Sequence, residues 1–64
     1  RKFEVKIMYS VNVTVETYSE RYCSNIVVVA VDEASARAEV NRKIHSRHGK
    51  DLTFIQITGI KRIA

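Results

Sequence analysis

The stretch "IVVVAVDEASARAEV", residues 26–40, changes its hydrophobic period at Asp32. Before this residue the apolar side chains are continuous, which is typical of a strand covered on both faces. After it they recur at Ala36, Val40 and Ile44, the spacing of one face of a helix. A buried strand is therefore expected to lead directly into an amphipathic helix.

The ends of this helix are marked by their own residues. Asp32 suits the N-cap, because its carboxylate can accept hydrogen bonds from the free backbone N–H groups of the first turn. Gly49 suits the C-terminal cap, where the backbone often takes a positive φ. We predict a helix over 32–48, supported by two acidic residues four positions before a basic one: Glu33 before Arg37, and Glu39 before Lys43.

Strands are predicted on both sides of this unit. Apolar residues occupy every odd position over 3–15, which indicates a long half-buried strand with a bend or bulge. After a turn near Ser19 and Glu20, a second strand is expected over 22–31. The segment 52–63, "LTFIQITGIKRI", predicts a third strand.

Alternation assigns the faces of the third strand. It places Ile55 and Ile57 on one face, with Leu52 and Phe54 on the other. Beyond them, Gly59 could be a bulge that brings the following isoleucine to the core.

The order β-β-α-β predicts a single domain over residues 1–64 of the α+β class. A helix that connects two parallel strands makes a right-handed crossover, and the long first strand fits between them. We therefore expect a two-layer fold, with a three-stranded sheet of order 2-1-3 and the helix packed on one face.

The second strand raises a question, because one helix covers only one face of a sheet. Its outward side chains are one of two sets, either Cys23, Val27, Val29 and Val31, or Tyr22, Ile26, Val28 and Ala30. An uncovered apolar face marks an association surface. A protein interface, with another protein or in a homodimer, is thus predicted at Ile26, Val27, Val28 and Val29.

Composition limits the functional classes. The chain has 11 Lys and Arg against 7 Asp and Glu, a net charge of +4, and a pI near 9.6, which favours acidic partners such as nucleic acid. No apolar run approaches the roughly 20 residues of a membrane span. The lone Cys23, expected in or near the core, favours a reducing, cytoplasmic location.

Neither catalysis nor metal binding is expected. Gly49 and Gly59 stand alone rather than in a phosphate-binding loop, and no nucleophile has a neighbouring base. His45 and His48 are spaced so that both could reach one ion, but zinc needs three or four ligands and basic residues surround them. We therefore predict no enzyme activity, cofactor or metal.

Cations gather near the helix C-terminus and at the end of the chain. They are Arg42, Lys43, Arg47, His48 and Lys50, followed by Lys61 and Arg62. Cations at a helix C-terminus complement the helix dipole, which accounts for part of the group. The remainder could contact phosphates, with Tyr18 and Tyr22 as candidates for base stacking.

Residues 30–60 resemble the ribosomal protein LX family of archaeal large subunits. The matching residues are Ala30, Asp32, Glu33, Ala36, Arg37, Ser46, Arg47, His48, Ile55 and Ile57. The usual basic-proline run before the last strand is replaced here by residues 49–52. This resemblance implies contact with ribosomal RNA through the basic helix end and the loop after it.

Two functions are therefore expected from the sequence. The first is a non-catalytic binding module that docks on RNA, the ribosome or another polyanion through its basic residues. The alternative is a protein-interaction module that acts through the apolar second strand. The size and element order are also similar to those of small phage proteins that inhibit a host protein.

Overall fold

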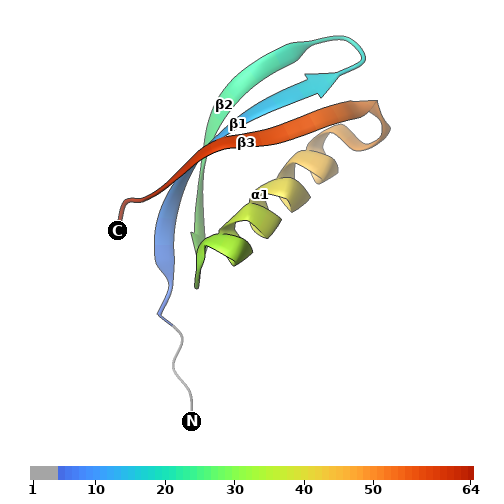
Figure 1. The fold of residues 1–64 in the computed structure, drawn as a ribbon. Coiled ribbons are helices and arrows are strands. Elements are labelled where there is room, and N and C mark those ends of the chain that lie inside the picture. Colours follow the sequence, from blue (N-terminus) through green and yellow to red (C-terminus); the bar gives the residue numbers. More distant parts are fainter. Residues whose placement is uncertain (1–4) are drawn as a thin grey trace.

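The computed structural model describes residues 5–64 (Figure 1) and contains five elements of secondary structure. These are β1 (Ile7–Thr17), β2 (Arg21–Ala30), α1 (Glu33–His48), the short 3-10 turn η1 (Gly49–Asp51) and β3 (Leu52–Arg62). The sheet order is β2-β1-β3, and β1 runs antiparallel to both neighbours. The predicted β-β-α-β fold of the α+β class is confirmed.

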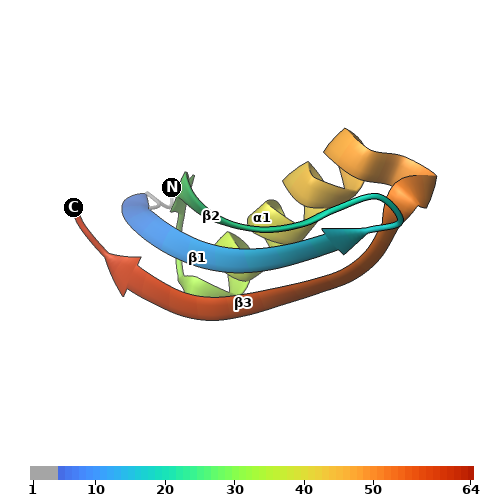
Figure 2. The same ribbon diagram turned by 90° about the horizontal axis from the view of Figure 1, so that it is seen from above.

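The sheet is long and curved, and α1 lies across its concave side (Figure 2). Along its principal axes the molecule measures 46 × 21 × 13 Å. The opposite side of the sheet, called the open face here, is covered by no described element (Figure 2). One helix thus gives the sheet one buried face and one exposed face.

The core lies between the central strand and the helix. The odd-numbered side chains of β1 from Tyr9 to Val15 are buried, as their alternation predicts. Three helix residues spaced four apart pack against them: Ala36, Val40 and Ile44. The first strand begins at Ile7 rather than at residue 3, and the predicted start of the strand, residues 3–4, lies outside the described part of the chain.

The structure decides which face of β2 is outward. Val28 is 3% exposed and belongs to the core, whereas Val27 and Val29 are 50% and 52% exposed. Ile26 also packs against the core from the helix side. Of the four predicted interface residues, Val28 is therefore buried in the core and Ile26 is partly buried against it, which leaves Val27 and Val29 exposed on the open face.

The third strand is interrupted by two bulges. Its register against β1 shifts at Thr53 and at Thr58, where one extra residue is inserted each time. The two threonine hydroxyls donate to carbonyls of β1, at 3.0 Å to Glu16 and at 3.3 Å to Asn12. Each hydroxyl thus supports the strand where the backbone ladder is broken.

These bulges correct one prediction and confirm another. Leu52 was predicted to lie on the same face as Phe54, opposite Ile55, but the bulge at Thr53 changes the phase, and Leu52 packs against the core as Ile55 does. The bulge predicted near Gly59 is present one residue earlier, and it brings Ile60 against the core.

Both predicted helix caps are present. Asp32 Oδ1 accepts a hydrogen bond from the Ser35 amide at 2.8 Å, which lowers the pKa of the Asp32 carboxyl. Gly49 has a φ of +57°, and its amide donates to the carbonyl of His45. Among the described residues Glu39 pairs with Arg42, three positions away, rather than with the predicted Lys43.

Candidate functional site

The cations at the C-terminal end of α1 differ in their exposure to solvent and in whether they form ion pairs. Arg42, Lys43, Arg47 and Lys50 are exposed, whereas His48 is half-buried. Among residues 5–64, the last three of these exposed cations take part in no ion pair. These three are the groups at this end that a phosphate could reach without breaking an existing contact.

Arg42 is held by the acidic residue one turn before it. Its Nε donates to Glu39 Oε1 at 3.3 Å, and its Nη2 contacts the other carboxylate oxygen. This pairing lowers the pKa of Glu39 and raises the pKa of Arg42. The charge of Arg42 is thus partly compensated within the helix.

His48 is tied to the sheet. Its Nε2 lies 2.5 Å from the hydroxyl of Tyr22 at the start of β2, and the two ring centroids are 5.7 Å apart. Both side chains are partly buried. His48 was predicted as a phosphate ligand and Tyr22 as a stacking candidate, but the structure engages each with the other.

The β1–β2 hairpin brings the second aromatic candidate to this end. The Thr17 hydroxyl accepts from the amides of Ser19 and Glu20, which forms a turn without glycine. At its tip the Tyr18 amide donates to the Asp51 carbonyl at 3.1 Å, and its side chain is 81% exposed. Tyr18 therefore lies at the same end of the molecule as Lys50.

We call this group of residues the basic end: Tyr18, Arg42, Lys43, Arg47 and Lys50. The acidic residues Glu20 and Asp51 lie at the same end and reduce its net charge. Salt-dependent attraction for an anion at this end is therefore moderate.

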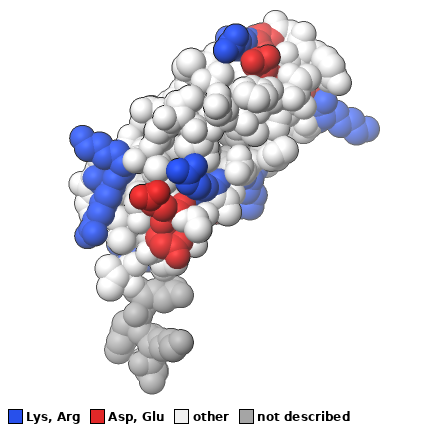
Figure 3. All heavy atoms as spheres, viewed as in Figure 1, with Lys and Arg blue, Asp and Glu red and all other residues white. Residues whose placement is uncertain are grey.

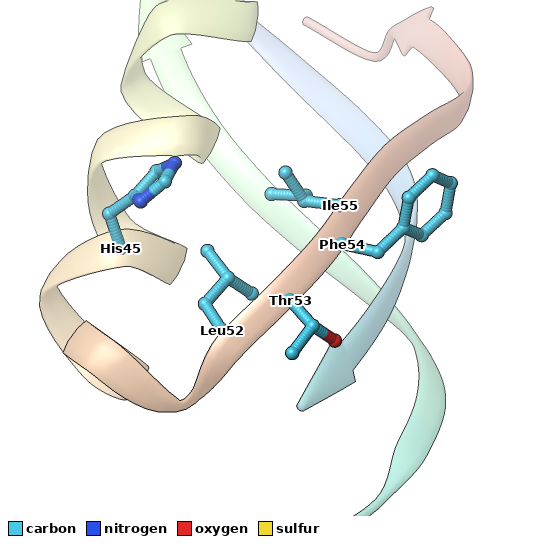
Figure 4. A pocket seen from close by; sticks show the side chains of 5 residues that line it. All are labelled: His45, Leu52, Thr53, Phe54 and Ile55. Atoms are coloured by element: carbon cyan, nitrogen blue, oxygen red, sulfur yellow. The ribbon is translucent and has the colours of Figure 1, made fainter. Parts of the chain in front are cut away.

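A hollow of about 300 Å³ lies between α1 and the first residues of β3. Figure 4 shows Leu52 and Ile55 pointing toward the helix, where His45 forms the opposite wall, while Thr53 and Phe54 point away. The Phe54 side chain, on the sheet's other face, is 44% exposed. The hollow thus has an apolar floor and a single titratable side chain.

Lys61 and Arg62 are not part of the basic end. They pair with Ser10 and Tyr9, near the start of β1, whereas Leu52 at the other end of β3 pairs with Thr17. Figure 3 accordingly shows Lys and Arg in separate groups, one of them over the C-terminal end of β3. The predicted set of seven basic residues is divided between the two ends of the molecule.

The open face has a polar centre and apolar residues toward one end. At its centre Asn25 Nδ2 donates to Ser10 Oγ at 2.7 Å and to Asn12 Oδ1 at 2.9 Å. Toward the end where β2 finishes, Met8 pairs with Val29 across the sheet. Exposed apolar side chains gather there: Met8, Val27, Val29 and Ile63.

Cys23 also lies on the open face. It is exposed rather than in or near the core as predicted, and its Sγ is 3.6 Å from the Thr14 hydroxyl. Alternate side chains of a strand point to the same face, so Cys23 lies on the open face with Val27 and Val29.

Residues 5–64 contain neither a metal-binding cluster nor a membrane-spanning helix. No three His, Cys, Asp or Glu side chains are close enough together to hold a metal ion. Within the same residues no helix has the length and apolar character needed to cross a membrane.

The chain was also compared with known proteins, and no family model, curated protein or solved structure matches it. Function is therefore inferred from the residues and geometry of this chain.

Proposed function

We propose that the chain is a non-catalytic binding module that contacts RNA, or a polyanion of similar chemistry, through its basic end. The observation that carries this proposal is the hydrogen bond from the Tyr18 amide to the Asp51 carbonyl. It places an exposed aromatic ring at the end of the molecule that carries Arg47 and Lys50, although the sequence separates them by about thirty residues.

Aromatic and cationic side chains together suit single-stranded nucleic acid. Lysine and arginine attract phosphates without reading sequence, and an exposed ring can stack on any base. The resemblance to the LX family implies contact with RNA through the same helix end and loop. Because Glu20 and Asp51 lie nearby, we expect a weak affinity that falls as the salt concentration rises.

Two charge-neutralising variants test this proposal. Arg47→Gln with Lys50→Gln removes two charges from the basic end, and Lys61→Gln with Arg62→Gln removes two from the opposite end. Both double variants lower the net charge from +4 to +2. The measurement is fluorescence anisotropy with a labelled single-stranded RNA at several salt concentrations.

We expect the Arg47/Lys50 variant to bind the RNA several-fold more weakly, with a smaller salt dependence, and the Lys61/Arg62 variant to bind more nearly as the wild type does. Equal losses in the two variants would show attraction to overall charge and contradict a localised site. Binding that does not respond to salt would contradict the proposal altogether.

Tyr18→Ala tests the aromatic contribution separately. It should weaken binding to RNA but not to heparin, which carries negative charges and no bases. An equal effect on both ligands would remove base stacking from the proposal and leave charge alone.

A second candidate function is association with another protein chain. It is favoured by the 50% and 52% exposure of Val27 and Val29 on a strand at the edge of the sheet. Val29→Lys is expected to abolish such association while the fold is retained, because a charge would enter the contact. Light scattering gives the mass of the assembly, and circular dichroism checks the fold.

A further inference from the structure

The two edges of the sheet differ in how they are protected against pairing with another chain. In natural proteins, bulges, lysine or proline prevent an edge strand from pairing with another chain. The edge strand β3 has two bulges, then Gly59, then Lys61 and Arg62. By these criteria β3 is a protected edge.

The other edge strand, β2, lacks these devices. Its ten residues pair with β1 in one unbroken register. The chain contains no proline, and no residue between Arg21 and Asp32 is charged. Among the described residues, none pairs with its free edge. An unbroken, uncharged and largely apolar edge of this kind is a template for another strand.

The backbone of β2 shows which groups are free at this edge. The Thr17 amide donates to the Glu20 carbonyl at 2.8 Å, and antiparallel pairs alternate between bonded and non-bonded along the ladder. Even-numbered residues of β2 therefore bond to β1. The odd-numbered residues, including Asn25, Val27 and Val29, direct their N–H and C=O groups outward.

We propose that this edge pairs with the β2 edge of a second copy of the chain, antiparallel and around a two-fold axis near Val27. Such a contact would join two three-stranded sheets into one of six strands, with both helices on the same side. It is independent of RNA contact at the basic end, and it gives the second candidate function a definite partner.

Two observations favour a second copy as the partner. The first is charge: β2 begins at Arg21, whose side chain is 72% exposed although it contacts Glu16 at 3.5 Å, and the strand is followed by Asp32 and Glu33. Antiparallel pairing of two copies places Arg21 of one copy near these two acidic residues of the other, twice in each dimer. A parallel arrangement would place like charges together.

The second observation is that the edge complements itself. With Val27 on the axis, Val27 faces its own copy, and Asn25 of one copy faces Val29 of the other. These residues are odd-numbered, so their outward N–H and C=O groups meet as bonded pairs. On the open face Val27 of each copy then lies opposite Val27 of the other and diagonal to its Val29.

Removing one outward N–H tests the proposal directly. Val27→Pro deletes an N–H that β1 does not use, and proline is tolerated where the N–H of an edge strand faces solvent. Val27→Lys is the second variant, which keeps the backbone intact and places a charge at the axis. The matched control is Met8→Lys, which puts the same charge on the open face of the central strand, away from the edge.

Sedimentation equilibrium over a range of protein concentrations is the measurement. We expect the wild type and Met8→Lys to reach twice the 7.3 kDa chain mass, and both Val27 variants to remain monomers with an unchanged circular dichroism spectrum. A wild type that is monomeric at all concentrations overturns the proposal. So does a dimer broken by Met8→Lys but not by the Val27 variants, which would indicate face-to-face stacking. RNA binding, measured separately, is unaffected by either result.

Discussion

The hydroxyl of Tyr22 lies 2.5 Å from Nε2 of His48, so the first residues of β2 are joined to the last residue of α1. These residues are 26 positions apart. The contact closes the end of the molecule that carries the hairpin tip, where the backbone of Tyr18 also bonds to Asp51. Two contacts thus hold the aromatic and the cationic parts of the basic end in one place.

The Tyr22–His48 contact is expected to contribute to stability. Tyr22→Phe removes only the hydroxyl and should lower the free energy of unfolding by about 0.5–1.5 kcal/mol, the usual net value of one hydrogen bond. Urea unfolding measures this. In a double-mutant cycle with His48→Ala, the coupling energy should account for most of the loss. Additive effects of the two substitutions would contradict a direct contact.

Gly49 and Gly59 should respond differently to alanine. Gly49 has a φ of +57°, which disfavours any residue with a Cβ, although no atom lies within 4 Å of the place the Cβ would take. Gly49→Ala should therefore cost about 1–3 kcal/mol through backbone strain alone.

Gly59→Ala is the matched control for this strain. Its φ is not positive, and the nearest atom to a Cβ would be Asn12 Nδ2 at 3.5 Å, an ordinary contact. We expect a change well below that of Gly49→Ala in the same urea experiment. Equal losses at the two glycines would contradict the role given to the positive φ.

Ile44 is expected to be the most sensitive position on the inner face of the helix. It is 3% exposed and packs in the core opposite the strands. Ile44→Val should cost about 0.5–1.5 kcal/mol and Ile44→Ala about 2–5 kcal/mol. A domain of this size has only a few kcal/mol in total, so the alanine variant should be largely unfolded at room temperature.

Val29→Ala provides the contrast to Ile44. Its side chain is half exposed on the open face, so truncation leaves no enclosed cavity and should cost the monomer little. A loss as large as that at Ile44 would show that the open face is covered in solution.

Much of the fold could be predicted because local signals agreed with one another. The period change at Asp32, the cap at Gly49 and the alternation in the first strand each determine one element, and together they leave few topologies. The phase of the third strand was harder to predict. A bulge inserts one residue into a strand and has no distinctive sequence here. No residue near Thr53 therefore indicates that the Leu52 side chain points toward the core.

The candidate site was less predictable than the fold, because it depends on distances between elements. His48 was grouped with the cations because it lies near them in the sequence, but its side chain contacts Tyr22 of β2. Lys61 and Arg62 follow the basic segment closely in the chain, yet β3 carries them to the opposite end. Alternate side chains of β2 point to opposite faces of the sheet. Which of the two sets is exposed depends on the face that the helix covers.

Stability should fall in acid partly through two carboxylates at the helix. The pKa of Asp32 is lowered by its bond to the Ser35 amide, and the pKa of Glu39 by its bond to Arg42. The ordinary pKa values of these groups are 3.8 and 4.5. As the pH falls through this range, the carboxyls of the unfolded chain bind protons, whereas those of the folded chain stay ionised to a lower pH. The stabilisation is therefore complete above about pH 5 and is lost as the pH falls through the lowered folded-state values.

A double variant isolates this contribution. Asp32→Asn keeps a cap that can accept a hydrogen bond, and Glu39→Gln removes the ion pair. Neither new side chain ionises, because both are amides. Thermal unfolding between pH 2 and pH 6 should show a shallower loss of Tm for the variant than for the wild type. Added salt should weaken the contribution of Glu39 more than that of Asp32, because screening acts on the ion pair. The same pH slope in both proteins would mean that other carboxylates determine acid unfolding.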